Sequence, residues 1–231
     1  MPTPDELKEL AALAAVDQLR SGIVLGLGAG STSLKAHRII GERLRSGKLR
    51  SITGVPCSKA IADAAREYGI PIGTLQSHPV IDITIDGADE VDPYLNLIKG
   101  GGGAHVSEKE VARATKREII IVDESKLSPV LGTKWPVPCE ILEQHVSIVS
   151  ERLKNLGAEE VRRRLNPDGS PFISDHGNPI VDAHFGLIPD PEALSLSLDT
   201  VQGLVGHGIF SGLASEVIVA GGNGIRRIFR Y

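Results

Sequence analysis

Ile23-Val-Leu-Gly-Leu-Gly-Ala-Gly-Ser-Thr-Ser33 is the stretch of sequence on which the predicted fold depends. Its first five residues predict a buried strand, and the glycines that follow predict a tight turn. Ala36, Ile40 and Leu44 then share one face of a helix. At such a strand-to-helix turn, backbone N–H groups, the helix dipole and hydroxyls converge on a phosphate. Residues 26–33 are therefore predicted to bind an anion.

Two familiar nucleotide motifs fit this loop poorly. Ser31 occupies the place of the third Rossmann glycine, and no acidic residue follows at the expected distance, around residues 46–50. No lysine precedes Ser31 or Ser33, as a nucleoside-triphosphate loop requires. A tight turn without a ligand is the alternative, but Ser-Thr-Ser offers more hydroxyls than a helix cap needs. The candidate binding residues here are Gly28, Ala29, Gly30, Ser31 and Thr32.

Strand and helix patterns alternate through the first half of the chain. Thr3, Pro4 and Glu6 form the pattern of a capping box that opens an amphipathic helix. Further strands are predicted at 51–55, 80–85 and 118–122, and further helices at 58–68 and 107–116. This alternation predicts an α/β fold, a mostly parallel, doubly wound, Rossmann-like sheet with helices on both faces.

The pattern changes at about residue 133. Strands are predicted at 137–142 and 159–165, a helix at 146–156, turns at 166–169 and 175–178 that bracket two short strands, and a helix from Asp190 toward Gly203. Strands at 216–220 and 225–229 then return to the main sheet. We therefore expect a Rossmann-like catalytic domain formed by residues 1–132 and 206–231, with a small inserted α+β domain at 133–205.

Composition excludes several classes of protein. The chain has 231 residues, 41% hydrophobic and 23% charged, with a net charge of -4, which gives no bias toward nucleic acid. Cys57 and Cys139 lie far apart without a CxxC pattern, which argues against a disulfide framework or structural zinc. No signal peptide and no apolar run of roughly 18 residues is present. We expect a cytoplasmic protein without nucleic-acid or membrane partners.

A second motif, Asp86-Gly-Ala-Asp-Glu-Val-Asp92, follows a predicted strand. Open α/β sheets bind ligands at the carboxyl ends of their strands, where Asp86 and Asp89 are expected. A solvated turn and a divalent-cation site are alternatives, although the spacing excludes an EF-hand. Lys99 and the glycines at 100–103 favour a functional site, because such a flexible run is costly unless backbone must approach a ligand closely.

Glu108 and Lys126 gain significance from their positions. Alone, Glu108 is an ordinary glutamate in a first helical turn, favoured by the helix dipole. Lys126 follows another strand end and is expected beside the other strand ends. His105 is the histidine nearest to this cluster, yet no histidine pair has metal-ligand spacing on a helix. We therefore expect the histidines to be surface or structural residues.

The ordered set of motifs resembles ribose-5-phosphate isomerase of type A. The segments are Gly-x-Gly-x-Gly-Ser-Thr at 26–32, Asp-Gly-Ala-Asp-Glu at 86–90, Lys-Gly-Gly-Gly-Gly-Ala at 99–104 with Glu-Lys at 108–109, and Asp-x-Ser-Lys at 123–126. The similarity continues through His207-Gly-Ile-Phe210 and Gly-Gly-Asn-Gly at 221–224. It implies interconversion of ribose 5-phosphate and ribulose 5-phosphate in the non-oxidative pentose phosphate pathway, by a homo-oligomer, expected to be a dimer, that requires no metal or other cofactor.

The same resemblance implies roles for single residues. Glu108 is expected as the general base, with Asp86, Asp89 and Lys99 around the reacting end of the sugar. The substrate-binding residues are expected to include Gly28, Ala29, Gly30, Ser31, Thr32, Gly100, Gly101, Gly102 and Lys126, together with Lys8 as a phosphate contact. Ala29 stands where the family commonly has threonine, and Cys57 where a hydroxyl residue is expected.

The chemistry agrees with these residue types. Aldose–ketose isomerisation moves a proton between C2 and C1 through an enediolate, so one carboxylate can act as base and then as acid. Lys99 and the glycine N–H groups can stabilise the enediolate without a metal. A phosphosugar-sensing domain, a sugar lactonase and an acyl-CoA transferase are alternative functions, but each accounts less well for the ordered motifs.

Overall fold

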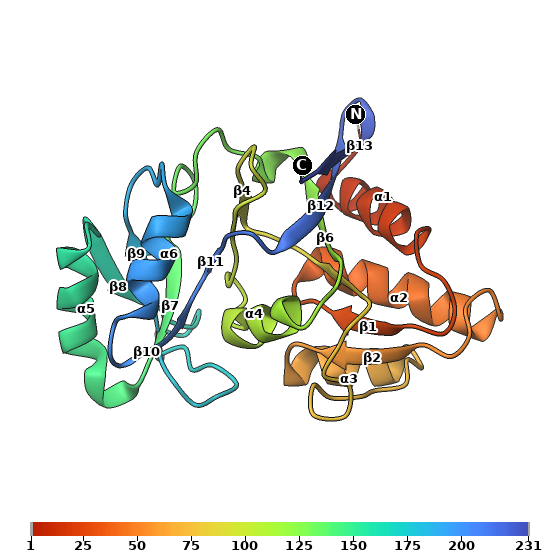
Figure 1. Cartoon of the computed structure of the whole chain (residues 1–231), viewed down its shortest axis with the longest axis horizontal. Coiled ribbons are helices and arrows are strands. Elements are labelled where there is room, and N and C mark those ends of the chain that lie inside the picture. The colour runs from red at the N-terminus through yellow and green to blue at the C-terminus, as the bar shows by residue number, and fades with distance from the viewer. Residues whose placement is uncertain (1, 231) are drawn as a thin grey trace. The chain divides into compact units, whose positions relative to one another are not determined.

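The computed structural model describes residues 2–230, and contacts within the chain divide it into two compact units (Figure 1). The larger unit contains the residues up to Ala88, Ser107–Lys126, and the residues from Leu213 onward. The smaller unit contains Asp89–Val106 and Leu127–Gly212. Each unit has its own hydrophobic core.

The larger unit is built on a six-stranded sheet with the order β13-β12-β6-β3-β1-β2. These strands are β1 (Val24–Leu27), β2 (Thr53–Pro56), β3 (Ile83–Asp86), β6 (Glu118–Asp123), β12 (Ala214–Gly221) and β13 (Gly224–Phe229). Every neighbouring pair is parallel except β12 and β13, which form an antiparallel hairpin at one edge. The predicted α/β fold with a mostly parallel sheet is confirmed. Its parallel strands bring Leu27, Asp86 and Asp123 to the same edge, since each is the last residue of its strand.

The helices of the larger unit are α1 (Pro4–Val16), α2 (Ser31–Arg45), α3 (Lys59–Glu67) and most of α4 (His105–Arg113), which begins in the smaller unit. The predicted capping box of α1 is present: the Thr3 side chain accepts from the N–H of Glu6, and the Glu6 side chain accepts from the N–H of Thr3. Helices α1 and α2 pack side by side (Figure 1), and both contact strands of the sheet. Buried Leu, Ile, Val and Ala side chains fill the space between helices and sheet, which is the main source of stability in such a layer.

The smaller unit contains two antiparallel sheets. One has the order β10-β7-β9-β8, formed by β7 (Val137–Ile141), β8 (Glu160–Arg163), β9 (Ile180–His184) and β10 (Leu204–His207). The other has the order β11-β5-β4, formed by β4 (Glu90–Val91), β5 (Leu97–Ile98) and β11 (Ile209–Phe210). The helical elements are α5 (Val146–Asn155), α6 (Pro191–Asp199) and two 3₁₀ turns, η1 (Glu124–Lys126) in the larger unit and η2 (Glu143–His145) in the smaller one.

The sequence patterns missed several short elements. Strands β4, β5 and β11 were not predicted, because strands of two residues are too short to show a hydrophobic period. The four-residue strand β10 was also not predicted. Of the two short strands expected around the turns at 166–178, only β9 forms; residues 171 and 173 make isolated bridges to Leu165 and Pro179. Helix α4 begins at His105 and ends at Arg113, and α6 ends at Asp199, short of the predicted ends at 116 and 203.

The compact units also differ from the predicted domain limits. Residues 89–106 group with the smaller unit because β4 and β5 pair with β11 there. Whether residues 133–205 form a separate domain stays a prediction. Among residues 2–230, no helix combines the length and apolar character needed to cross a membrane.

Candidate active site

The glycine loop between β1 and α2 is shaped by close approaches that only glycine permits. A Cβ atom at Gly28 would lie 2.1 Å from the carboxylate of Asp86, and Gly30 has a φ of 91°, in the left-handed region. Gly30 is the N-cap of α2, and no side chain caps this helix end. Ser31 and Thr32 form its first turn. The loop thus presents backbone and hydroxyls at the positive end of a helix dipole, as an anion site requires.

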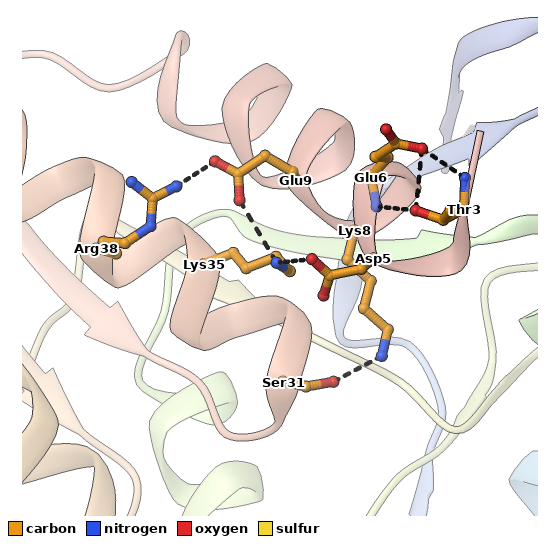
Figure 2. A network of polar contacts seen from close by, with 8 residues as sticks. All are labelled: Thr3, Asp5, Glu6, Lys8, Glu9, Ser31, Lys35 and Arg38. Atoms are coloured by element: carbon orange, nitrogen blue, oxygen red, sulfur yellow. Dashed lines mark hydrogen bonds and ion pairs between the residues drawn. The ribbon is translucent and has the colours of Figure 1, made fainter.

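Lys8 reaches this helix end from α1. Its Nζ donates to Ser31 Oγ at 2.9 Å (Figure 2). Lys35 lies between Asp5 and Glu9, and Arg38 also pairs with Glu9, so ion pairs connect the two helices along the same face (Figure 2). These contacts hold the Lys8 ammonium against the first turn of α2, where its charge adds to that of the helix dipole.

Asp86 ends β3 and is buried, with 1% of its surface exposed. Its Oδ1 accepts from the N–H of Gly87 at 2.7 Å and from Ser33 Oγ at 3.4 Å. The structure thus brings Asp86 together with Gly28 and with a serine of α2. This carboxylate and the glycine loop form one group at the carboxyl edge of the sheet, as the strand order predicts.

Glu108 and Lys126 also belong to the larger unit. Glu108 lies in the first turn of α4, as predicted, and is 5% exposed. A carboxylate buried at a helix start is favoured by the dipole yet largely shielded from water. Lys126 ends the 3₁₀ turn η1 after β6, where Asp123 Oδ1 accepts from the N–H of Ser125 at 2.9 Å.

The remaining predicted residues, Asp89, Lys99 and Gly100 to Gly102, belong to the smaller unit. The β4–β5 hairpin brings them together: the N–H of Asp89 donates to the carbonyl of Ile98 at 2.9 Å, and Asp89 Oδ2 accepts from the N–H of Gly101 at 2.7 Å. A Cβ at Gly101 would lie 2.8 Å from that carboxylate. A side chain at position 101 would therefore displace the Asp89 carboxylate.

Lys99 is a buried lysine, with 2% of its surface exposed. Its N–H donates to the carbonyl of Gly208 at 2.8 Å, and its Nζ lies 5.5 Å from the centre of the Phe210 ring. At this separation the electron-rich face of the ring attracts the ammonium. The contact accounts for the presence of Phe210 in the His207-Gly-Ile-Phe210 segment, which the sequence showed only as part of a resemblance.

The other two acidic residues of the second motif have structural roles. Glu90 is fully buried, and its carboxylate accepts from the N–H groups of Gly132, Lys134 and Trp135 at 3.0 to 3.2 Å. Asp92 Oδ1 accepts from the N–H groups of Tyr94 and Asn96 at 2.8 Å, which closes the turn between β4 and β5. The motif therefore combines candidate chemistry at Asp86 and Asp89 with local architecture at Glu90 and Asp92.

Sequence reasoning missed Arg164 altogether. Its Nη1 donates to the carbonyls of Gly100 at 2.7 Å and Gly101 at 3.2 Å. No local pattern marks this arginine, because its partners in the glycine run are more than sixty residues away along the chain. Its pairing with Asp182 on the next strand is the only available signal, and it emerges only once the register of β8 and β9 is known.

Metal ligands are not grouped anywhere in the part of the chain that the structure describes: no three His, Cys, Asp or Glu side chains there are arranged to hold an ion. The divalent-cation alternative for the acidic motif therefore has no support from geometry. That the reaction needs no metal stays a prediction.

Comparison with known proteins agrees with the ordered motifs. The family model for ribose 5-phosphate isomerase A (phosphoriboisomerase A) matches residues 53–224. A ribose-5-phosphate isomerase A from Chloroflexus aurantiacus is 49% identical over 221 residues, which cover 96% of this chain and 92% of that protein. One from Desulfatibacillum aliphaticivorans is 48% identical over 228 residues and covers 99% of both chains. The chain belongs to the ribose 5-phosphate isomerase A family.

Solved structures of ribose 5-phosphate isomerases share this fold. A D-ribose-5-phosphate isomerase in complex with phospho-erythronic acid is 38% identical, with a TM-score of 0.97 over 99% of this chain and 100% of that chain. The resemblance inferred from the motifs is thus confirmed, and the fold class with it. The ribose 5-phosphate isomerase A family consists of aldose–ketose isomerases, which sets aside the sensor, lactonase and transferase alternatives.

Proposed function

We propose that this protein interconverts D-ribose 5-phosphate and D-ribulose 5-phosphate through an enediolate, as a step of the non-oxidative pentose phosphate pathway. The observation that carries the proposal is Glu108: a carboxylate 5% exposed, nine residues after Lys99, in a chain of the ribose 5-phosphate isomerase A family. A shielded carboxylate is the kind of group that exchanges a proton with carbon.

The proton transfer is assigned to Glu108. In the open-chain aldose, the carboxylate takes the proton from C2, a C1–C2 double bond forms, and O1 becomes negative. A proton then passes from O2 to O1, Glu108 returns its proton to C1, and C2 becomes the ketone. One carboxylate therefore acts as base and then as acid, and it ends in its starting state.

Stabilisation of the negative oxygen is assigned to Lys99 and the glycine run. The Lys99 ammonium is shielded from water beside the Phe210 ring, which strengthens its field on a nearby anion. The glycine run adds further N–H donors beside the N–H of Gly101, which the Asp89 carboxylate holds at 2.7 Å. We assign ring opening to Asp86, which is buried and ordered by the Gly87 N–H.

Substrate binding is assigned chiefly to the phosphate. The Gly28 to Thr32 loop and Lys8 supply N–H groups, hydroxyls and one ammonium at the start of α2. Lys126 is proposed as a further ligand contact. A relative with 38% identity was solved with phospho-erythronic acid; its carboxylate is planar and negative like an enediolate, and we expect the same acid to inhibit this protein competitively.

The test is the formation of ribulose 5-phosphate from ribose 5-phosphate by the purified protein, with and without EDTA. We expect equal turnover in both conditions. Turnover abolished by EDTA would contradict the metal-free mechanism, and binding of ribose 5-phosphate without turnover would restore the sensor hypothesis.

We also propose that the protein is cytoplasmic and works as a homodimer. Support comes from the resemblance to ribose-5-phosphate isomerase of type A and from the two cysteines, Cys57 and Cys139, which lie far apart without a CxxC pattern. Sedimentation equilibrium tests the assembly, and a monomer at micromolar concentration would refute it.

A further inference from the structure

The smaller unit carries an arginine, Arg164, that forms a partly buried ion pair and also contacts the glycine run. Arg164 follows β8, and its side chain is only 13% exposed. Its Nε donates to Asp182 Oδ2 at 3.0 Å, while Nη2 donates to Oδ1 of the same carboxylate. Such a two-point pair fixes the plane of the guanidinium. The N–H of Arg164 also donates to the carbonyl of Ile180 at 2.8 Å, so both backbone and side chain are anchored to β9.

The remaining edge of the guanidinium holds two carbonyls of the glycine run. Arg164 Nη1 donates to Gly100 at 2.7 Å and to Gly101 at 3.2 Å. The carbonyl of Gly100 also accepts from the N–H of Gly103 at 2.9 Å, which closes a turn over residues 100–103. Four glycines have little conformational preference of their own, so contacts from outside the run must select this turn.

Phe172 lies against both Arg164 and the end of the glycine run. Its ring centre lies 5.8 Å from Arg164 Cζ, and a Cβ at Gly103 would come within 2.4 Å of the ring. Gly103 itself has a φ of 80°, in the left-handed region. The ring therefore contacts the guanidinium and lies against the end of the run. We call this group the clamp; it consists of Asp182, Arg164 and Phe172.

The clamp sets the direction of the N–H groups. In a trans peptide the C=O and the N–H point in opposite directions. Carbonyls of Gly100 and Gly101 that face Arg164 therefore turn the N–H groups of Gly101 and Gly102 away from it. The first of these meets Asp89 at 2.7 Å. The N–H of Gly102 points away from Arg164 in the same way and is a preorganised donor.

We propose that Arg164 is a positioning residue of the isomerase: by holding the carbonyls of Gly100 and Gly101, it aims the N–H of Gly102 at the oxygen that becomes negative. Arg164 acts through these peptide groups and not by touching the sugar. The inference rests on the proposed function, because it needs a reaction that places negative charge on an oxygen. It assigns part of the catalytic geometry to a residue outside the family's ordered motifs.

The test compares Arg164→Met with Arg163→Met. Arg163 is the matched control, because it neighbours Arg164 but its side chain pairs with Glu143 at 2.8 Å, on another part of the smaller unit. We expect Arg164→Met to lower kcat on the order of 10²-fold with little change in KM. The misplaced peptide groups of the glycine run would stabilise the transition state less, while phosphate binding persists. Arg163→Met should match the wild type in both constants.

Two further measurements separate positioning from loss of structure. Guanidinium added at millimolar concentration should restore part of the kcat of Arg164→Ala, whereas Arg163→Ala should not respond. Hydrogen exchange of a peptide covering residues 99–104 should accelerate in Arg164→Met and not in the control. Should Arg164→Met fail to fold, Arg164→Lys takes its place, because one ammonium cannot reproduce the fork.

The outcomes are distinct. A folded Arg164 variant with the kcat of its Arg163 counterpart overturns the inference, and so does a kcat loss without faster exchange at 99–104. A wild-type protein without isomerase activity refutes the proposed function instead. In that case unchanged exchange at 99–104 still refutes the clamp, and accelerated exchange supports it.

Discussion

Asp89 and Arg164 hold the two ends of one peptide group: Asp89 Oδ2 accepts the N–H of Gly101 at 2.7 Å, and Arg164 Nη1 donates to the carbonyl of Gly100 at 2.7 Å. A carboxylate and a guanidinium on opposite sides leave this peptide no freedom to rotate. A Cβ at Gly101 would lie 2.8 Å from the Asp89 carboxylate, and glycine avoids this contact. The flexibility that the sequence suggests for residues 100–103 is thus removed by tertiary contacts.

Because both residues order the same peptide, their substitutions should not be additive. We expect Asp89→Asn and Arg164→Met each to lower kcat, and the double variant to lose less than the product of the two effects. A coupling of roughly 0.5–3 kcal/mol is typical of residues that share one network. Steady-state kinetics of the four proteins measures it. Strictly multiplicative losses would show that the two contacts act independently.

Glu108→Gln tests the proton transfer. The amide keeps the size of the side chain but cannot take a proton, so we expect kcat to fall by at least about 10²–10⁴-fold with the fold intact. Binding of phospho-erythronic acid, measured by calorimetry, should persist. Glu110→Gln is the matched control, since Glu110 is exposed on the same helix. Near-normal turnover of Glu108→Gln would remove Glu108 from the mechanism.

Lys8→Met tests the phosphate site. Lys8 donates to Ser31 Oγ at 2.9 Å, far along the chain from the residues assigned to chemistry. Loss of its charge should weaken the binding of the substrate and of the transition state alike, so KM should rise with little change in kcat. Inorganic phosphate should also inhibit this variant less than the wild type. Lys48→Met, at an exposed lysine, is the control. A fall in kcat at unchanged KM would assign Lys8 to the reacting end.

His37 predicts acid sensitivity of the fold. It is fully buried on α2, neither ring nitrogen has a hydrogen-bond partner among the described residues, and burial lowers its pKa from 6.5 to about 4. Between pH 6.5 and about 4, the His37 side chain is therefore protonated in the unfolded chain but neutral in the folded one. The free energy of unfolding falls as the pH drops through this range. At about 1.4 kcal/mol per pKa unit, the loss reaches up to about 3 kcal/mol.

Urea unfolding of wild type and His37→Leu from pH 7.5 to 4 measures this effect. We expect the free energy of unfolding to depend less on pH in His37→Leu, while His78→Leu keeps the slope of the wild type. An unchanged slope in His37→Leu would assign the acid sensitivity to other groups.

Local sequence was sufficient to predict the regular elements of the larger unit and the neighbourhood of the site. The capping box at Thr3 and Glu6, the strand before Gly28 and the place of Glu108 in the first turn of α4 depend on residues a few positions apart. Their physical causes are helix-end hydrogen bonds and hydrophobic periods, which a linear pattern displays. The ordered motifs also indicated the family, because they specify residue types in a fixed order along the chain.

Tertiary structure decided which acidic residues of the second motif hold the backbone in place and which are candidates for catalysis. Glu90 and Asp89 are neighbours in one motif, yet Glu90 holds the N–H groups of Gly132 and Trp135, whereas Asp89 holds that of Gly101. Arg164 joins the glycine run only because β8 pairs with β9, sixty residues beyond the run. Such contacts depend on which distant strands pair, and the sequence of a short segment carries no record of that choice. The sequence thus determined the residue types and the family, and the fold alone determined which atoms those residues hold.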